Sequence, residues 1–298
     1  MVPLLECVPN VSEGRRSEVI RELAEAFEAP GVRLLDLSSD PDHHRTVLTL
    51  AGEAAALEAG LLRLYEVALD QIDLTQHHGV HPRVGAVDVV PFVPLGGSTM
   101  ADAVAAACRL GEEVARRFGL PVYLYEQAAV SPVRRSLAEV RRGGLSGLQA
   151  RLAGDPVGWA PDFGPLEISP RSGATVIGAR SFLIAFNAVL DTADVSLARR
   201  VARAVRASNG GLPAVRAIGV PLPSRGRAQV SLNLLDYRQT SLATALARVE
   251  AEAIRLGARV EETELIGLVP EEAALGSLAQ LLRLPGLPPD RLLEHALR

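Results

Sequence analysis

The chain has 298 residues, of which 48% are hydrophobic and 22% charged, and this composition is ordinary for a globular protein of about two domains. All 31 basic residues are arginine, which excludes Schiff-base lysines, P-loop lysines and lysine general bases. A net charge of −4 and an aromatic content of 4% argue against nucleic acid as a partner.

The two cysteines and the N-terminus predict a cytoplasmic protein. Cys7 and Cys108 stand in dissimilar surroundings and lack metal-site spacing, so both are expected to be reduced thiols. The first ten residues include Glu6 and no basic residue, and no apolar run approaches the roughly 20 residues of a transmembrane helix. We therefore expect a protein that is neither secreted nor inserted in a membrane.

The first half of the chain alternates between strand and helix patterns. The order strand, helix, strand, strand, helix is followed by a further strand, helix and strand, then by an Arg-rich helical stretch, and finally by a segment too rich in Pro and Gly for regular structure. Predicted strands are 4–8, 32–37, 46–50, 87–93 and 122–125; predicted helices are 17–27 with Ser12 as N-cap, 53–69, 101–118 and 133–152; the irregular segment is 157–180.

The second half repeats the order of the first. Two copies of a split β-α-β unit fit the pattern, so we predict an α/β (α+β) fold of two subdomains, residues 1–177 and 178–298. Mixed sheets would carry helices on their outer faces and leave a cleft between the sheets. The predicted strands are 182–190, 214–220 and 229–235; the predicted helices are 196–207 and 242–256, and capping helices with a Pro-rich link at 285–289 fill 271–298.

A loop holds half of the six histidines and leads directly into an apolar strand. His81 is held off any helix by Gly79 and Pro82, and the adjacent Arg83 is expected to keep its imidazole neutral. A neutral imidazole can accept a proton, so His81 is our candidate acid/base. Zinc binding by His77, His78 and His81 is the alternative, but Gly79 breaks the helical spacing; we expect His77 and His78 to be solvated.

Two charged residues and one loop are further candidates. Arg45 at a strand start suits bidentate capture of a carboxylate, or an ion pair with Asp40 or Asp42. Asp88, on an apolar strand, needs a partner such as Arg83 or a histidine. The loop 164–173 contains no dinucleotide or P-loop motif, so its backbone is expected to face a flat heterocycle or to serve as a linker.

Five ordered blocks resemble one enzyme family. They resemble glutamate formimidoyltransferase, the formiminotransferase part of the bifunctional formiminotransferase-cyclodeaminase, and they span nearly the whole chain. The blocks are LECVPNVSEG at 5–14, HPRVGAVDVVPF at 81–92, WAPDFGP at 159–165, GATVIGAR at 173–180 and LIGLVP at 265–270.

The resemblance implies a function. The family transfers a formimino group from N-formimino-L-glutamate to N5 of tetrahydrofolate in histidine catabolism, needs no metal and forms dimers. Asn10 and Arg45 are expected to bind the amino-acid substrate, and the cyclodeaminase activity is expected to be absent. The catalytic histidine falls on His81, and the folate-contacting loop falls on Gly164, Pro165, Leu166, Glu167, Ile168, Ser169, Pro170, Arg171, Ser172 and Gly173.

Some positions depart from the family pattern. Ser38 stands where animal enzymes carry aspartate, and His44 stands where asparagine is usual before the arginine. Some relatives move a formyl group or act on 5-formyltetrahydrofolate, and no residue separates these activities. A folate-binding protein without catalysis and a metal-dependent amidohydrolase are the alternatives from other functional classes.

Overall fold

The chain forms two compact units in a computed structural model that describes residues 3–284 and 287. The Pro-rich link expected at 285–289 lies outside these residues except for Leu287. The first unit is Met1–Ser181 and the second is Phe182–Arg298. The first runs past residue 177 because its strand β7 (Thr175–Ala179) continues to Ala179.

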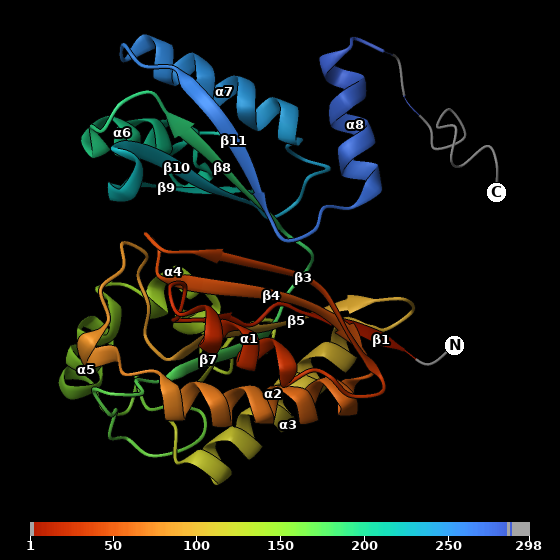
Figure 1. Cartoon of the computed structure of the whole chain (residues 1–298), viewed down its shortest axis with the longest axis vertical. Coiled ribbons are helices and arrows are strands. Elements are labelled where there is room, and N and C mark those ends of the chain that lie inside the picture. Colours follow the sequence, from red (N-terminus) through yellow and green to blue (C-terminus); the bar gives the residue numbers. More distant parts are fainter. Residues whose placement is uncertain (1–2, 285–286, 288–298) are drawn as a thin grey trace. The chain divides into compact units, whose positions relative to one another are not determined.

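The first unit is built on a mixed seven-stranded sheet (Figure 1). From one edge the order is β3, β4, then β1 with the short β2, then β5, β7 and β6; β5–β7 and β7–β6 are parallel and the other pairs antiparallel. The strands are β1 (Leu4–Cys7), β2 (Asn10–Val11), β3 (Val32–Asp40), β4 (Arg45–Gly52), β5 (Val87–Leu95), β6 (Val122–Glu126) and β7.

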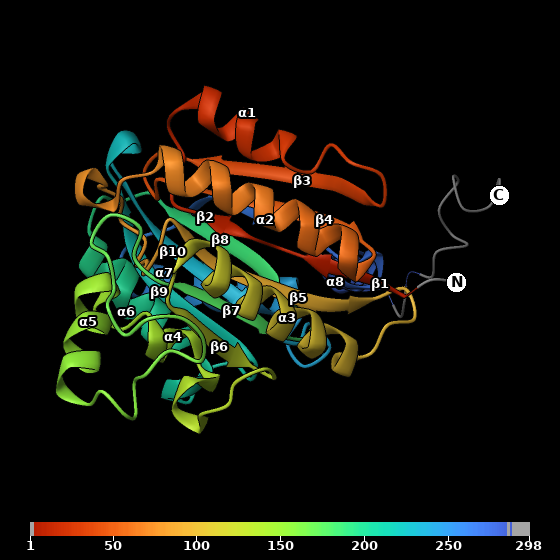
Figure 2. The ribbon, with the colours of Figure 1, turned by 90° about the horizontal axis from the view of Figure 1, so that it is seen from below.

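Helices cover both faces of this sheet. Because strand side chains alternate between faces, Val122 and Leu124 face one core, while Tyr123 and Tyr125 face another. The first core lies under α1, α2 and α3 (Figure 2), and the second packs against α4 and α5. The helices are α1 (Ser17–Glu25), α2 (Ala54–Gln71), α3 (Met100–Phe118), α4 (Leu137–Val140) and α5 (Gly144–Gly154), with short 3₁₀ turns η1 (Leu74–Gln76) and η2 (Pro132–Arg135).

Local chemistry sets the ends of these helices. Thr99 and Asp102 form a capping box at the start of α3, and Gly119 ends it at φ 61°. The single helix expected over 133–152 was wrong, because Gly143 and Gly144 adopt positive φ and divide it. Ser12 is likewise not the cap of α1, since its Oγ donates to the carbonyl of residue 85.

The second unit repeats the topology with a four-stranded sheet in the order β11, β8, β10, β9. The first unit places β5, β1, β4 and β3 in the same relative order, so the duplicated split β-α-β unit is confirmed. Every pairing here is antiparallel, because only the first unit has the added parallel strands. Its elements are β8 (Ile184–Leu190), α6 (Val195–Val205), η3 (Ala207–Asn209), β9 (Val215–Leu222), η4 (Pro223–Arg225), β10 (Arg227–Leu234), α7 (Leu242–Arg255), β11 (Val260–Ile266) and α8 (Glu271–Leu281).

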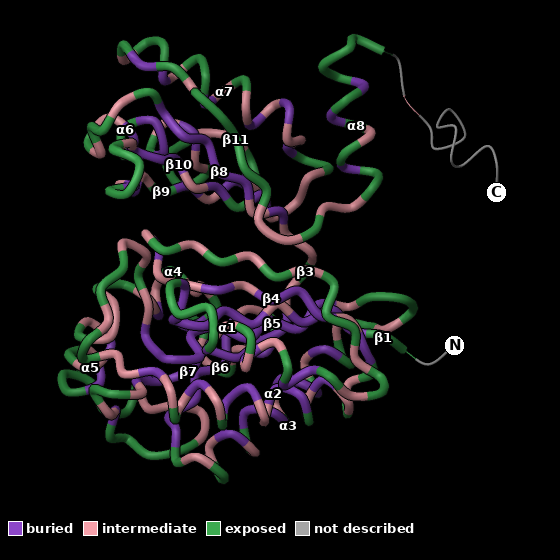
Figure 3. Tube along the Cα trace, in the orientation of Figure 1, coloured by how far each residue is buried: buried purple, intermediate pink, exposed green. Residues whose placement is uncertain are grey.

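The apolar residues of each unit converge on its own sheet. Figure 3 shows buried residues along the inner strands and on parts of the helices, whereas the edge strands β3 and β11 are exposed or intermediate. Across residues 3–284, no helix combines the length and the hydropathy that crossing a bilayer requires.

Candidate active site

One arginine joins the turn between β3 and β4 to the histidine loop. Arg83 Nη2 donates to the carbonyl oxygens of His43 at 2.7 Å and His81 at 2.9 Å, and Nη1 donates to that of His44 at 2.9 Å. Its planar guanidinium therefore fixes three carbonyls on two segments that are distant in the sequence. This brings Arg45, the first residue of β4, close to His81.

His81 is held as a neutral imidazole of one tautomer. Its Nδ1 lies 2.8 Å from the carbonyl oxygen of Pro82, and its Nε2 lies 2.8 Å from Nη1 of Arg45. A carbonyl only accepts, so we assign the ring proton to Nδ1 and leave Nε2 unprotonated. Nη1 of Arg45 also lies 3.2 Å from Nδ1, so this cation lies against the ring rather than along the Nε2 lone pair. Burial, then Arg45, Arg141 and His43, hold the pKa of His81 well below 6.5.

Positive charge exceeds negative charge around Arg45. Burial and then Arg141 lower the pKa of Arg45 to about 9, against the opposing effect of Asp88, so the guanidinium stays charged at neutral pH. The carboxylate of Asp88 is already used, because it pairs with Arg141 and accepts the N–H of Val84 at 2.8 Å. No carboxylate among the described residues forms an ion pair with Arg45, whose Nε is shielded from solvent without a hydrogen bond.

A second polar cluster supports the turn. His44 Nε2 lies 3.1 Å from Oε1 of the buried Glu13, and its ring stacks on His77 at 3.8 Å. Burial and then Arg83 lower the pKa of His77 to about 4. At φ 49° His44 occupies the left-handed region of the backbone, in which asparagine is also enriched.

The candidate folate loop is attached directly behind the histidine loop. Ala86 N–H donates to the carbonyl of Ser172 at 2.9 Å, and Ala174 N–H donates to that of Val84 at 2.8 Å. Gly85 and Gly173 face each other in this bridge, and a Cβ on Gly173 would overlap the backbone opposite. The close approach of two glycines is thus what places the end of the loop beside the segment that carries His81.

The start of the loop is anchored by a buried ion pair. Asp162 pairs with Arg134 at 2.8 Å and accepts the N–H of Leu124 at 2.7 Å. The loop between the two anchors is mostly open to solvent. Gly164, Pro165, Leu166, Glu167, Pro170 and Arg171 are exposed, Ser169 and Ser172 are half-buried, and Ile168 and Gly173 are buried.

Asn10 lies on the same sheet as Arg45, but its side chain hydrogen-bonds to the backbone of Val8. It pairs with Val47 of β4, two residues beyond Arg45, and side chains two apart on a strand share a face. Its Nδ2 donates to the carbonyl of Val8 at 2.7 Å. The structure therefore brings Arg45, His81 and the end of the loop together, and places Asn10 on the face that Arg45 shares.

Three expectations about this site were wrong. Arg83 is not the main cation acting on His81, because its guanidinium is directed at carbonyls and Arg45 and Arg141 act instead. His77 is not merely solvated, although His78 is exposed. The partner of Asp88 is Arg141, which lies 53 positions away; sequence reasoning missed it, and its only signal was the density of arginine around 134–142.

In the described part of the chain, no group of three or more His, Cys, Asp or Glu side chains has a geometry that could hold a metal ion.

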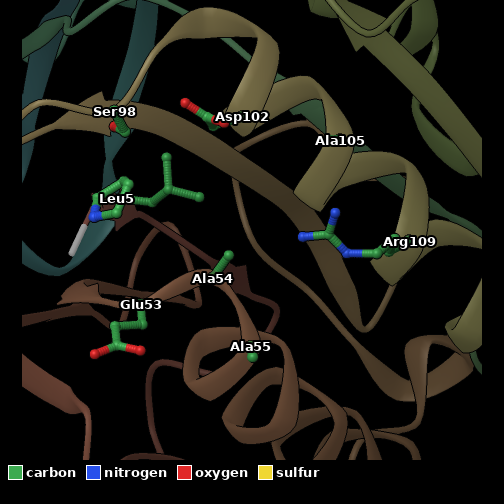
Figure 4. Close-up of a pocket in the computed structure, with 9 residues that line it drawn as sticks. Leu5, Glu53, Ala54, Ala55, Ser98, Asp102, Ala105 and Arg109 are labelled. Atoms are coloured by element: carbon green, nitrogen blue, oxygen red, sulfur yellow. The ribbon is translucent and has the colours of Figure 1, made fainter.

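A cavity of about 300 Å³ lies apart from the candidate site. It opens where β1, α2 and α3 begin, and Leu5, Ala54, Ala105 and Arg109 help to line it (Figure 4). None of the candidate site residues lines that cavity.

Comparisons with known proteins agree over the length of the chain. Residues 4–180 match the model of the formiminotransferase domain, N-terminal subdomain, and residues 185–282 match that of the formiminotransferase domain. Glutamate formimidoyltransferase of Streptococcus pyogenes serotype M1 is 42% identical, with 92% of each chain covered. The enzyme of the same name from Thermoplasma acidophilum is 38% identical, over 98% of this chain and 96% of its own.

A longer relative matches equally well. Formimidoyltransferase-cyclodeaminase of Sus scrofa is 42% identical over 94% of this chain, which covers 52% of that protein. Both subdomain models and full-length relatives therefore assign this chain to the formiminotransferase family of transferase enzymes.

Proposed function

We propose that this protein transfers the formimino group of N-formimino-L-glutamate to N5 of tetrahydrofolate and releases glutamate. The proposal is supported by its relatives' names and by one feature of the site. Arg45 presents a charged guanidinium that no carboxylate of the described residues neutralises, beside an imidazole whose Nε2 carries a lone pair. A carboxylate-bearing substrate and a proton to be abstracted suit these two groups.

His81 would act as general base and then as general acid. Its Nε2 takes the N5 proton as N5 bonds to the formimino carbon. It returns that proton to the glutamate nitrogen as the bond between carbon and this nitrogen breaks, so the imidazole ends neutral. Help of this kind is worth about 10²–10⁴-fold in rate, and aligning the two substrates supplies more.

The other candidate residues would position the substrates. Arg45 would bind a carboxylate of the amino-acid donor, and Asn10 would hydrogen-bond the amidine or a carboxylate. The loop 164–173, anchored at both ends, would offer exposed backbone groups to the pterin of tetrahydrofolate.

The physiological setting is part of the proposal. The family resemblance supports a cytoplasmic homodimer that acts in histidine catabolism, without a metal ion. Arg45 and the histidine loop that Arg83 holds are the elements of the first unit on which the transferase assignment depends.

The test is turnover with defined donors. Purified protein is incubated with tetrahydrofolate and either formiminoglutamate or formylglutamate, and the released glutamate is followed. The absorbance of the cyclised folate product is read after acid treatment, because this chain is not expected to carry out the cyclisation itself. We expect both signals with formiminoglutamate. A product only with formylglutamate would reassign the one-carbon unit, and tetrahydrofolate binding without turnover of either donor would leave a binding protein.

A further inference from the structure

A cation of the protein itself lies against the imidazole that should accept the substrate proton. Nη1 of Arg45 lies 2.8 Å from Nε2 of His81, and the Pro82 carbonyl holds the proton on the opposite ring nitrogen. The same Nη1 lies 3.2 Å from Nδ1, so the cation lies against the ring rather than along the Nε2 lone pair. An imidazolium formed at His81 would be repelled by this guanidinium, so protonation is disfavoured while Arg45 stays in contact.

Arg45 has reason to move when a carboxylate arrives. A carboxylate offers a guanidinium an opposite charge and two parallel hydrogen bonds, whereas the imidazole is a neutral acceptor. Arg45 is also repelled by Arg141 and Arg83, while the nearby Asp88 is held by Arg141 and the backbone. A carboxylate would thus be a better partner than the ring for this guanidinium.

We propose that Arg45 is a latch on His81 that the donor substrate releases: a carboxylate of the N-formimino amino acid draws the guanidinium away from the ring, and the imidazole then becomes a stronger base. This inference rests on the proposed function. It makes Arg45 a positioning residue that acts through His81 as well as a substrate ligand. It also links proton transfer to the presence of a donor that carries a free carboxylate.

The charges around the ring support this sequence of events. Burial is the first cause that lowers the pKa of His81, followed by the charges of Arg45, Arg141 and His43. Arg83 and Asp88 face the same region and are engaged elsewhere. Neutralising Arg45 with a carboxylate removes the largest charge effect on the ring, so the imidazole becomes a stronger base only when the donor is bound.

The test titrates His81 by NMR in the full chain labelled with ¹³C-histidine. The resonance is assigned with His81→Asn, and no folate is present, so no transfer occurs. The probes are N-acetyl-L-glutamate and its uncharged diamide, which are similar in shape and differ in charge. At saturation we expect the dicarboxylate to raise the midpoint by at least about one pH unit and the diamide to leave it unchanged.

Two variants sharpen the result. In Arg45→Met the titration midpoint of His81 should already be raised without ligand, and it should no longer respond to N-acetyl-L-glutamate. The exposed Arg142, which pairs with Glu139, provides the matched control, because Arg142→Met should titrate as wild type. If Arg45→Met fails to fold, wild-type kinetics give the same information: the acid-limb pKa of kcat should exceed that of kcat/KM for the donor.

The latch and the transferase assignment can fail separately. A midpoint that N-acetyl-L-glutamate does not move, or a kcat profile whose acid limb matches that of kcat/KM, overturns the latch even if turnover is normal. A protein that shows the shift but transfers neither one-carbon group keeps the latch and loses the proposed function.

Discussion

Replacing Glu13 by glutamine should reveal how much one buried carboxylate contributes to the stability of the first unit. Oε1 accepts the N–H groups of Gly14 and Arg15 at 2.9 Å and of Arg16 at 3.1 Å, and Oε2 accepts Nε of Arg16 at 2.6 Å. The residue is 1% exposed. These donors all favour the ionised form, and glutamine would set an amide group among them.

The pKa of Glu13 gives the size of the effect. Burial raises this pKa, but the backbone N–H groups of Arg15 and Arg16 and then the Arg16 side chain lower it, from 4.5 to about 2. A carboxyl whose folded pKa is depressed stabilises the fold above its unfolded pKa, and this contribution is lost as the pH falls through the folded value. At about 1.4 kcal/mol for each pKa unit, the contribution at neutral pH is about 3 kcal/mol.

Urea unfolding followed by circular dichroism tests this reasoning. Glu13→Gln should lower the free energy of unfolding by about 3 kcal/mol at pH 7 and by less than about 1 kcal/mol at pH 2.5, because wild type then loses the same contribution. Glu28→Gln, at an exposed position after α1, should stay within about 0.5 kcal/mol of wild type throughout. A penalty for Glu13→Gln of equal size at both pH values would refute the argument.

Three further changes probe the site and its loops. His81→Ala should reduce kcat at least about tenfold with unchanged circular dichroism, and a near-normal rate would remove the proposed base. Asp88→Ala should cost about 3–5 kcal/mol in urea unfolding because it leaves Arg141 buried and unpaired, and adding Arg141→Met should recover part of this loss; additive losses would contradict the pairing. Gly173→Ala should lower the Tm more than Gly97→Ala, because both have positive φ but only Gly173 would press a Cβ against backbone; equal shifts would show that the approach is not tight.

Much of the fold could be predicted because its signals are local. The helices α2, α3 and α7 have long apolar periodicities, and their ends were placed within a few residues. The strand β7 was missed because it follows a segment dense in Pro and Gly, and its pairing with β5 and β6 is set by tertiary contacts. The strand β11 (VEETELI) was missed because its charged residues are exposed on an edge.

The site was predictable in its members but not in its pairings. His81 and Arg45 could be singled out from the sequence because His81 lies in a Gly/Pro loop before an apolar strand and Arg45 lies at the start of a strand. Proximity in sequence then suggested Arg83 as the cation that acts on His81. The structure gives that role to Arg45 and Arg141, because strand pairing and a helix on the far side of the sheet bring distant residues together.

The three carbonyls held by Arg83 have a consequence for how this scaffold can vary. This rigid fork ties the turn after β3 to the histidine loop together with Arg15, which donates to the carbonyls of Pro41 and His78, while Asp40 accepts the N–H of His43 within the turn. Positions of either segment that take no part in these contacts are the ones at which new residues can be grafted. A lysine in place of Arg83 would keep the charge but lose the geometry, and the two segments would lose one of their shared anchors.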